Sequence, residues 1–189
     1  SLAFKKFLSK LLKDKFNITD KSLDADNLYL IGTRVEKSYI RVESDEVTYP
    51  LHIILRFNLE RKIFNNEISV TDIPDAWNEE YKRLFDKKVE KDTDGSLQDV
   101  HWYAGLFGYF PTYSLRALAA AQFAHQLRID LSQLDLSIEN GKFEDLVKWL
   151  KTNIHQKASF FSTNEVLEQV TNSSLNAKYF KNYINNRYL

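Results

Sequence analysis

The chain has 189 residues, with 26 Lys and Arg balanced by 26 Asp and Glu, and no cysteine or methionine. Equal numbers of opposite charges give no reason to expect nucleic acid or an anionic membrane as a partner. The lack of cysteine excludes disulfides and thiolate metal sites, so a reducing cytoplasm is the default expectation. No apolar run approaches the roughly 20 residues that span a bilayer, and no secretory signal is evident. Because the chain begins without Met inside a helical pattern, we expect further residues upstream of Ser1.

The hydrophobic pattern predicts an all-α fold. Only 5 Gly and 3 Pro interrupt the chain, and most windows follow the 3.6-residue period of a helix. Residues 2–16 form one amphipathic pattern with a lysine-rich outer face. Adsorption of this helix to a membrane is conceivable, but we favour packing against a protein core.

A second helical pattern covers residues 38–64 but contains Pro50. Proline removes a backbone hydrogen bond and clashes with the preceding turn. The helix therefore either kinks there or starts afresh near Thr48, with Pro50 in its first turn. Further helices are predicted over residues 75–85, from Pro111 to residue 127, and over residues 143–154, 163–170 and 177–186.

The densest group of polar and aromatic side chains lies in residues 95–113. This segment contains Gln98, Asp99, His101 and Trp102, followed by Tyr109 and Tyr113. Such donors, acceptors and a titratable ring are typical of an active site. The alternative is an aromatic core cluster, with Gln98 and Asp99 capping helix ends, and the residues alone leave both open.

Metal-binding motifs are missing from the sequence. The four histidines are well separated, whereas a zinc helix of the His-Glu-x-x-His type needs two imidazoles one turn apart. Arg41 and Asp45 would lie one turn apart on one face if their segment were helical, and an ordinary surface ion pair is then the simplest interpretation.

Two stretches resemble signatures of a known family. Residues 95–102, Gly-Ser-Leu-Gln-Asp-Val-His-Trp, resemble the Gly-x-x-Gln-Asp-x-His-Trp signature of the thermostable carboxypeptidase Taq family of zinc metallocarboxypeptidases. Residues 40–45, Ile-Arg-Val-Glu-Ser-Asp, resemble the family's Ile-Arg-x-x-Ala-Asp signature, with Ser44 in place of alanine. Residues 47–56, 74–78 and 108–115 are also similar to the family, and Arg116 stands where glycine is usual.

The resemblance implies that this chain is a single helical C-terminal segment, residues 1–189, of such an enzyme. The family's His-Glu-x-x-His helix, its downstream His-Glu motif and its Asp-x-Arg-x-Thr motif precede the matched region and are absent here. Zn²⁺ is therefore expected in the full-length enzyme, with none bound by this chain alone. The implied partners are peptide C-termini, the upstream zinc-binding half and a second copy of the chain.

The resemblance also suggests a role for each candidate residue. Arg41 would bind the substrate's terminal carboxylate, because a guanidinium can bind it in a bidentate manner, and Asp45 would orient Arg41. The remaining candidates are oxyanion donors (His101, Tyr109 and Tyr113) and residues that position substrate or its binding groups (Gln98 and Asp99). We therefore expect the substrate-recognition part of a carboxypeptidase, inactive alone. The alternative is an orphaned helical module that binds or scaffolds other proteins without catalysis.

Overall fold

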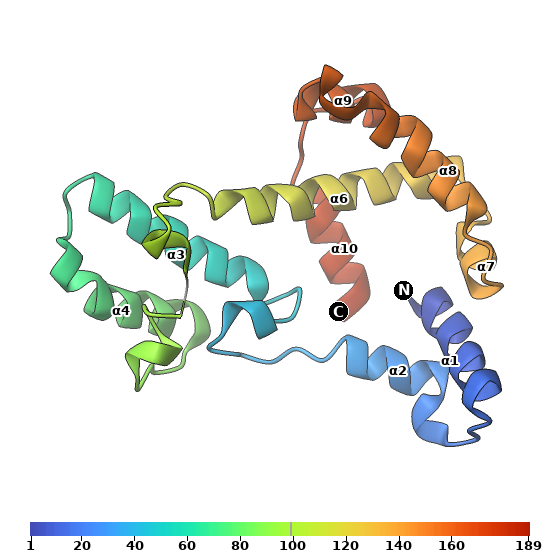
Figure 1. Ribbon diagram of the computed structural model, residues 1–189, viewed down its shortest axis with the longest axis horizontal. Helices are drawn as coiled ribbons and strands as arrows, with labels where there is room; N and C mark the ends of the chain where they lie inside the picture. Colours follow the sequence, from blue (N-terminus) through green and yellow to red (C-terminus); the bar gives the residue numbers. More distant parts are fainter. Residues whose placement is uncertain (99) are drawn as a thin grey trace. The chain divides into compact units, whose positions relative to one another are not determined.

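The computed structural model describes residues 1–98 and 100–189, with the backbone only at Ala158. Every secondary-structure element over these residues is helical, which confirms the all-α prediction (Figure 1). The α-helices are α1 (Leu2–Phe16), α2 (Ala25–Gly32), α3 (Tyr49–Phe64), α4 (Ile73–Phe85), α5 (Val100–Tyr103), α6 (Pro111–Asp130), α7 (Leu134–Glu139), α8 (Glu144–Asn153), α9 (Thr163–Thr171) and α10 (Lys178–Tyr188). Short 3₁₀ turns lie at Lys21–Leu23, Arg41–Glu43, Val70–Asp72, Asp92–Asp94 and His155–Phe160.

The long helices begin and end close to their predicted positions. α1 has the predicted bounds, and α9 starts with a capping box in which Ser162 and Glu165 satisfy each other's backbone amides. The short helices α2, α5 and α7, of eight, four and six residues, were not predicted, because about two turns or fewer give too little periodicity to recognise. None of the described helices is long and apolar enough to span a membrane.

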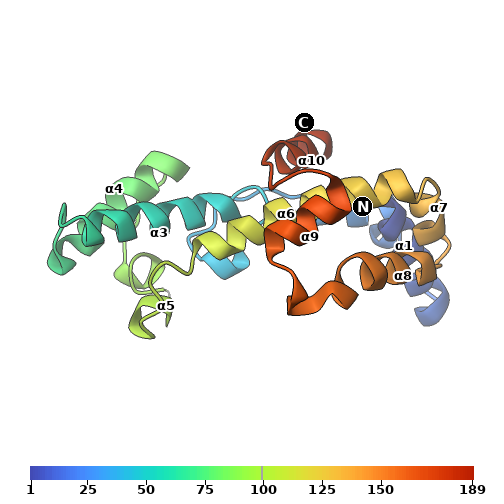
Figure 2. The same ribbon diagram turned by 90° about the horizontal axis from the view of Figure 1, so that it is seen from above.

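The chain divides into two compact units. Unit 1 comprises residues 1–34 and 117–189, and unit 2 comprises residues 35–116. In unit 1, α1 packs against α2 and α7, and Figure 2 shows α1, α7 and α8 at the same end of that unit. Its core includes Leu127, Leu134, Ile138 and Trp149.

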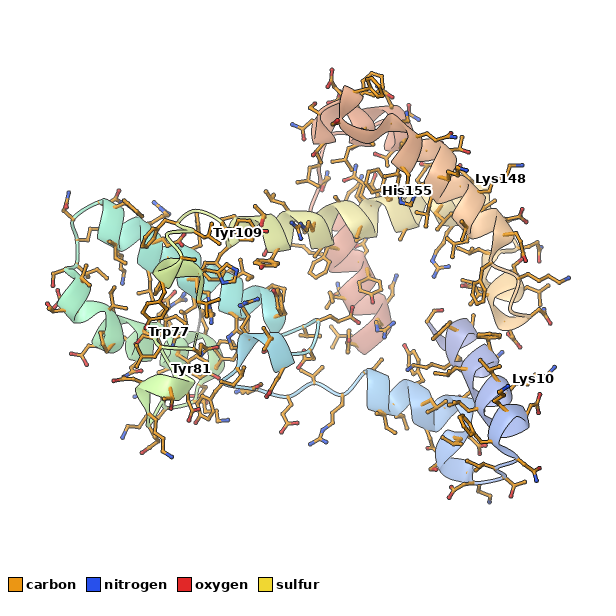
Figure 3. All side chains as sticks on the ribbon, viewed as in Figure 1. Lys10, Trp77, Tyr81, Tyr109, Lys148 and His155 are labelled. Carbon is orange, nitrogen blue, oxygen red and sulfur yellow. The ribbon has the colours of Figure 1, made fainter. Side chains whose placement is uncertain are left out.

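Unit 2 is built on the pairing of α3 with α4, which lie side by side (Figure 1). Leu55 and Leu59 of α3 are fully buried against Trp77 and Tyr81 of α4. Figure 3 labels these two aromatic residues on α4. Both aromatic side chains are completely buried. All the candidate site residues lie in this unit's range, residues 35–116.

The structure decides how Pro50 is accommodated. α3 starts at Tyr49 with Thr48 as its N-cap and Pro50 in the first turn, where a missing amide costs nothing. The second of the two sequence-based alternatives is thus confirmed, and the single kinked helix from residue 38 is wrong. Ahead of α3 the chain forms only a 3₁₀ turn at Arg41–Glu43, followed by extended Ser44.

Candidate active site

Arg41 is buried in unit 2, with 6% of its surface exposed. Its guanidinium carbon lies over the rings of Tyr113, Tyr49 and Phe110, at 5.2, 5.7 and 5.7 Å from their centroids. Its Nη1 donates to the Tyr49 hydroxyl oxygen at 2.7 Å. Aromatic faces attract a cation and a planar guanidinium stacks well on them, so the three rings hold this side chain in place.

Asp45 has a different role from the one that helical spacing suggested. Because the 3₁₀ turn ends before it, Asp45 is not one helical turn from Arg41, and the surface ion-pair interpretation is wrong. Its carboxylate accepts from the backbone amides of Val47 and Thr48, each at 2.9 Å, and from that of Glu36 at 2.8 Å. Burial alone would raise the pKa of Asp45, but these hydrogen bonds lower it below its ordinary value.

Gln98 connects the segment before α5 to the segment that carries Arg41. Its Oε1 accepts from the backbone amide of Arg41 at 3.1 Å. Its Nε2 donates to the carbonyl oxygens of Tyr39, Asp94 and Gly95 at 3.0–3.1 Å. The side-chain amide of Gln98 is thus hydrogen-bonded to the backbone through both its oxygen and its nitrogen, and it fixes the position of the Arg41 backbone. Asp99, its neighbour in the signature, lies outside the described residues.

His101 and the two tyrosines of the segment form one cluster. Nε2 of His101 lies 3.0 Å from the Tyr113 hydroxyl oxygen, so one of the two groups donates to the other. The Tyr109 ring lies 5.6 Å from the imidazole and 5.5 Å from the Tyr113 ring, and Figure 3 labels Tyr109 just before α6. All three side chains are half-buried. The structure therefore brings the three predicted oxyanion donors together.

The aromatic core interpretation of this segment is also partly correct. Phe110 is fully buried, and Trp102 packs against the core of unit 2, edge-on to Trp77 at 6.1 Å. Phe107 is 45% exposed and lies at the edge of the cluster. Core residues and polar candidates thus lie in one sequence stretch, which contributes both to the packing of unit 2 and to the candidate site.

Glu60 of α3 holds the loop between α5 and α6, and sequence reasoning did not identify it. It is 4% exposed, and its carboxylate accepts from the indole nitrogen of Trp102 at 2.7 Å and from the Gly108 amide at 3.1 Å. Gly105 and Gly108 have φ angles of 71° and 73°, which are accessible to glycine at little cost. Tyr49, which binds Arg41, was also missed.

Arg116, the departure from the family signature, is exposed on α6. Its guanidinium lies 5.8 Å from the centroid of the Tyr113 ring. A side chain at this position thus reaches the Tyr113 ring of the cluster, which a glycine could not do.

A metal site is not formed by the part of the chain that the structure describes. No group of three or more His, Asp or Glu side chains has the placement that could hold a metal ion among these residues. The donor set here consists of a guanidinium, phenols and one imidazole, which suits anion binding and proton donation rather than metal coordination.

The chain is similar to one family of metallopeptidases along almost its whole length. Residues 1–188 match the family described as carboxypeptidase Taq (M32) metallopeptidase. The chain is 36% identical to carboxypeptidase 1 of Bacillus subtilis over 95% of its length, and 40% identical to thermostable carboxypeptidase 1 of Thermus thermophilus over 91%. It covers 36% and 33% of these two proteins.

Solved structures agree with the sequence comparison. The fold superposes on metallocarboxypeptidase 1 of Trypanosoma cruzi with a TM-score of 0.95 and 35% identity, covering 100% of this chain and 38% of that one. A carboxypeptidase from Pyrococcus furiosus gives a TM-score of 0.91 at 33% identity, again with 38% of its chain covered. The chain thus spans little more than a third of the proteins that it matches.

Proposed function

Because the chain belongs to the carboxypeptidase Taq (M32) family of metallopeptidases, we propose that it is the substrate-recognition part of an enzyme that releases C-terminal amino acids from peptides. It forms the C-terminal segment of that enzyme, and a zinc-binding part upstream completes the active site. Its substrates are peptide C-termini, and the chain alone is inactive.

The observation that carries this proposal is the shared position of Tyr113. Its ring lies under the buried guanidinium of Arg41, and its hydroxyl lies 3.0 Å from Nε2 of His101. Tyr113 thus contacts both the cation proposed to bind the carboxylate, Arg41, and its fellow proton donor, His101. Hydrolysis of a C-terminal peptide bond needs this combination, because the terminal carboxylate and the scissile carbonyl belong to adjacent groups of the substrate.

Each site residue then has a role that its contacts support. Arg41 binds the terminal carboxylate, and its low exposure strengthens the attraction between the two charges. Gln98 positions the backbone of Arg41, and Asp45 orients the residue indirectly by fixing the start of α3. Asp99 completes this group by resemblance to the family signature.

The proton donors stabilise the oxyanion that develops at the scissile carbonyl. When Nε2 of His101 donates to the Tyr113 oxygen, the Tyr113 proton is available to that oxyanion, and Tyr109 adds a second phenol beside the first. Zinc, supplied with the upstream part, provides the Lewis acid and activates water when bound. The residues described here form no ligand set for it.

Exposed apolar side chains on α3 support a protein partner. Leu55 and Leu59 are buried on one side of this helix, whereas Phe57 and Phe64 on other faces are 41% and 64% exposed. Phe64 makes an edge contact at 5.4 Å with the exposed ring of Phe107. Neighbouring large apolar side chains left exposed on a helix are often covered by a partner, and the upstream part of the enzyme is the partner that we propose.

The test compares the chain alone with the chain co-expressed with its upstream coding segment. We expect zinc binding and release of C-terminal amino acids only from the pair, and a loss of activity of at least a hundredfold in Arg41→Ala, on the order expected for an unpaired charged contact. Hydrolysis by the chain alone contradicts the division of the active site. An inactive but stable pair favours the non-catalytic binding module.

A further inference from the structure

We infer that the hydroxyl of Tyr49 is a second donor to the terminal carboxylate of the substrate, beside the guanidinium of Arg41. This inference rests on the proposed function, because it assigns a further residue to the same carboxylate site. The first observation is the position of Tyr49 as the opening residue of α3. Its hydroxyl oxygen accepts from Nη1 of Arg41 at 2.7 Å, and its ring meets that of Tyr113 edge-on at 6.1 Å.

The second observation concerns the hydrogen-bonding capacity of the Tyr49 hydroxyl. A phenol has one proton to donate as well as lone pairs to accept. Arg41 uses a lone pair, and over residues 1–98 and 100–189 the Tyr49 hydroxyl has no further hydrogen-bond partner. Phenol hydroxyls that are partly withdrawn from water usually find an acceptor. With its oxygen held by Nη1, the Tyr49 proton must point away from the guanidinium and is available to a ligand.

A carboxylate fits these two donors. It offers two oxygens with about four lone-pair sites, so one oxygen can accept from Arg41 and the other from Tyr49. The position of Tyr49 is constrained, because Asp45 accepts from the backbone amides of Val47 and Thr48 just before it and Pro50 fixes the first turn of α3. The donor is therefore already in place before the ligand binds, which reduces the entropic cost of binding.

The same geometry predicts selection against blocked C-termini. A C-terminal amide replaces one acceptor oxygen with an NH₂ group, which is a donor. That group would face a donor at this site, and a site that leaves polar groups unpaired rejects the wrong ligand strongly. As an O–H donor, Tyr49 adds this selectivity without a second positive charge. Arg41, whose guanidinium carries donors only, also opposes the NH₂ group, so both residues contribute to the preference for the free acid.

The experiment measures equilibrium binding of two probes to the chain assembled with its upstream segment. The probes are N-acetyl-L-phenylalanine and N-acetyl-L-phenylalaninamide, which differ in the terminal group alone. We expect Tyr49→Phe to raise the Kd of the acid about tenfold and to leave that of the amide within about twofold. Tyr103→Phe is the matched control, because Tyr103 is 69% exposed in the same unit, and its acid binding should not change.

The opposite result identifies Tyr49 as a packing partner only. Acid binding in Tyr49→Phe would then stay constant or tighten, and the inference would be overturned. Replacement of Tyr49 by 3-fluorotyrosine, a stronger donor of nearly the same size, is a second measurement that does not depend on loss of the hydroxyl. It should tighten acid binding and leave amide binding unchanged.

Arg41→Ala separates this inference from the proposed function. If Arg41→Ala abolishes the preference for acid over amide but Tyr49→Phe does not reduce it, the carboxylate site stands and the role of Tyr49 is wrong. If Arg41→Ala retains the preference, the proposed carboxylate site is itself wrong, and the inference about Tyr49 is overturned with it.

Discussion

The carboxylate of Glu60 bridges the two ends of the loop between α5 and α6, accepting from the indole of Trp102 at 2.7 Å and from the amide of Gly108 at 3.1 Å. His101 precedes the first of these contacts by one residue, and Tyr109 follows the second by one residue. The distance between the proposed proton donors therefore depends on a buried side chain of α3 that takes no direct part in their chemistry.

Replacement of Glu60 should loosen this loop. Glu60→Ala leaves the indole and the Gly108 amide without their buried acceptor, and we expect the free energy of unfolding to fall by about 1–3 kcal/mol for each group that stays unpaired. Urea unfolding followed by tryptophan fluorescence measures this change. Glu79→Gln on the exposed surface of α4 is the control and should be neutral.

Asp45 should make the stability of unit 2 sensitive to acid. Burial opposes its ionisation, but the hydrogen bonds from Glu36, Thr48 and Val47 outweigh burial and lower its pKa in the folded state. Its contribution is thus fully present above the ordinary aspartate pKa of about 4 and is lost as the pH falls through the lower folded value. We expect Asp45→Ala to cost about 1 kcal/mol at pH 7, as loss of a helix-start acceptor does.

Thermal unfolding between pH 7 and pH 2 tests this expectation. The difference in stability between the original chain and Asp45→Ala should narrow only at the acid end of the range. A difference that stays constant down to pH 2 would mean that the ionised carboxylate is not the stabilising species.

Gly141 and Gly105 form a matched pair for separating strain from steric clash. Both have a φ of 71°, and alanine in that region costs about 1–2 kcal/mol. A Cβ at Gly141 would lie 2.7 Å from Cε2 of Phe7, whereas one at Gly105 would meet nothing within 4 Å. Gly141→Ala should therefore be more destabilising than Gly105→Ala by about 1–3 kcal/mol, measured by denaturant unfolding. Equal losses would show that α1 moves aside freely.

Gln122 should be essential for the connection between α9 and α10. It is fully buried, donates to the Thr171 hydroxyl at 2.8 Å and to two backbone carbonyl oxygens, and accepts from the Asn176 amide at 3.0 Å. Gln122→Met keeps the shape but removes these bonds, and we expect a loss of about 2–4 kcal/mol with faster amide hydrogen exchange at Asn176. Gln126→Met, one turn further along α6, should cost less than about 1 kcal/mol, because among the described residues the Gln126 side chain bonds only to the exposed Asp130.

Local sequence patterns were sufficient to determine most of the long helices, whereas the start of α3 was decided by the structure. The periodicity of residues 2–16, the capping box at Ser162 and the proline at the start of α6 all act within one or two turns, and the observed bounds follow them. The signature residues also led to the segments that we propose for the site. Because the interactions that start and stop a helix act between residues close in sequence, the sequence alone can indicate where these helices begin and end.

The partners of polar side chains were decided by tertiary structure. The buried face of α3 includes three polar residues, His52, Arg56 and Glu60, beside Leu55 and Leu59. Their four-residue spacing is visible in the sequence, but it is equally typical of an exposed helix face. Only the packing of α4 and α5 shows that these side chains are buried. Likewise Arg41 and Asp45 seemed to be partners, because four-residue spacing pairs side chains only within a helix. Packing instead paired Arg41 with Tyr49 and Tyr113, whose distance along the chain gives no indication of their proximity.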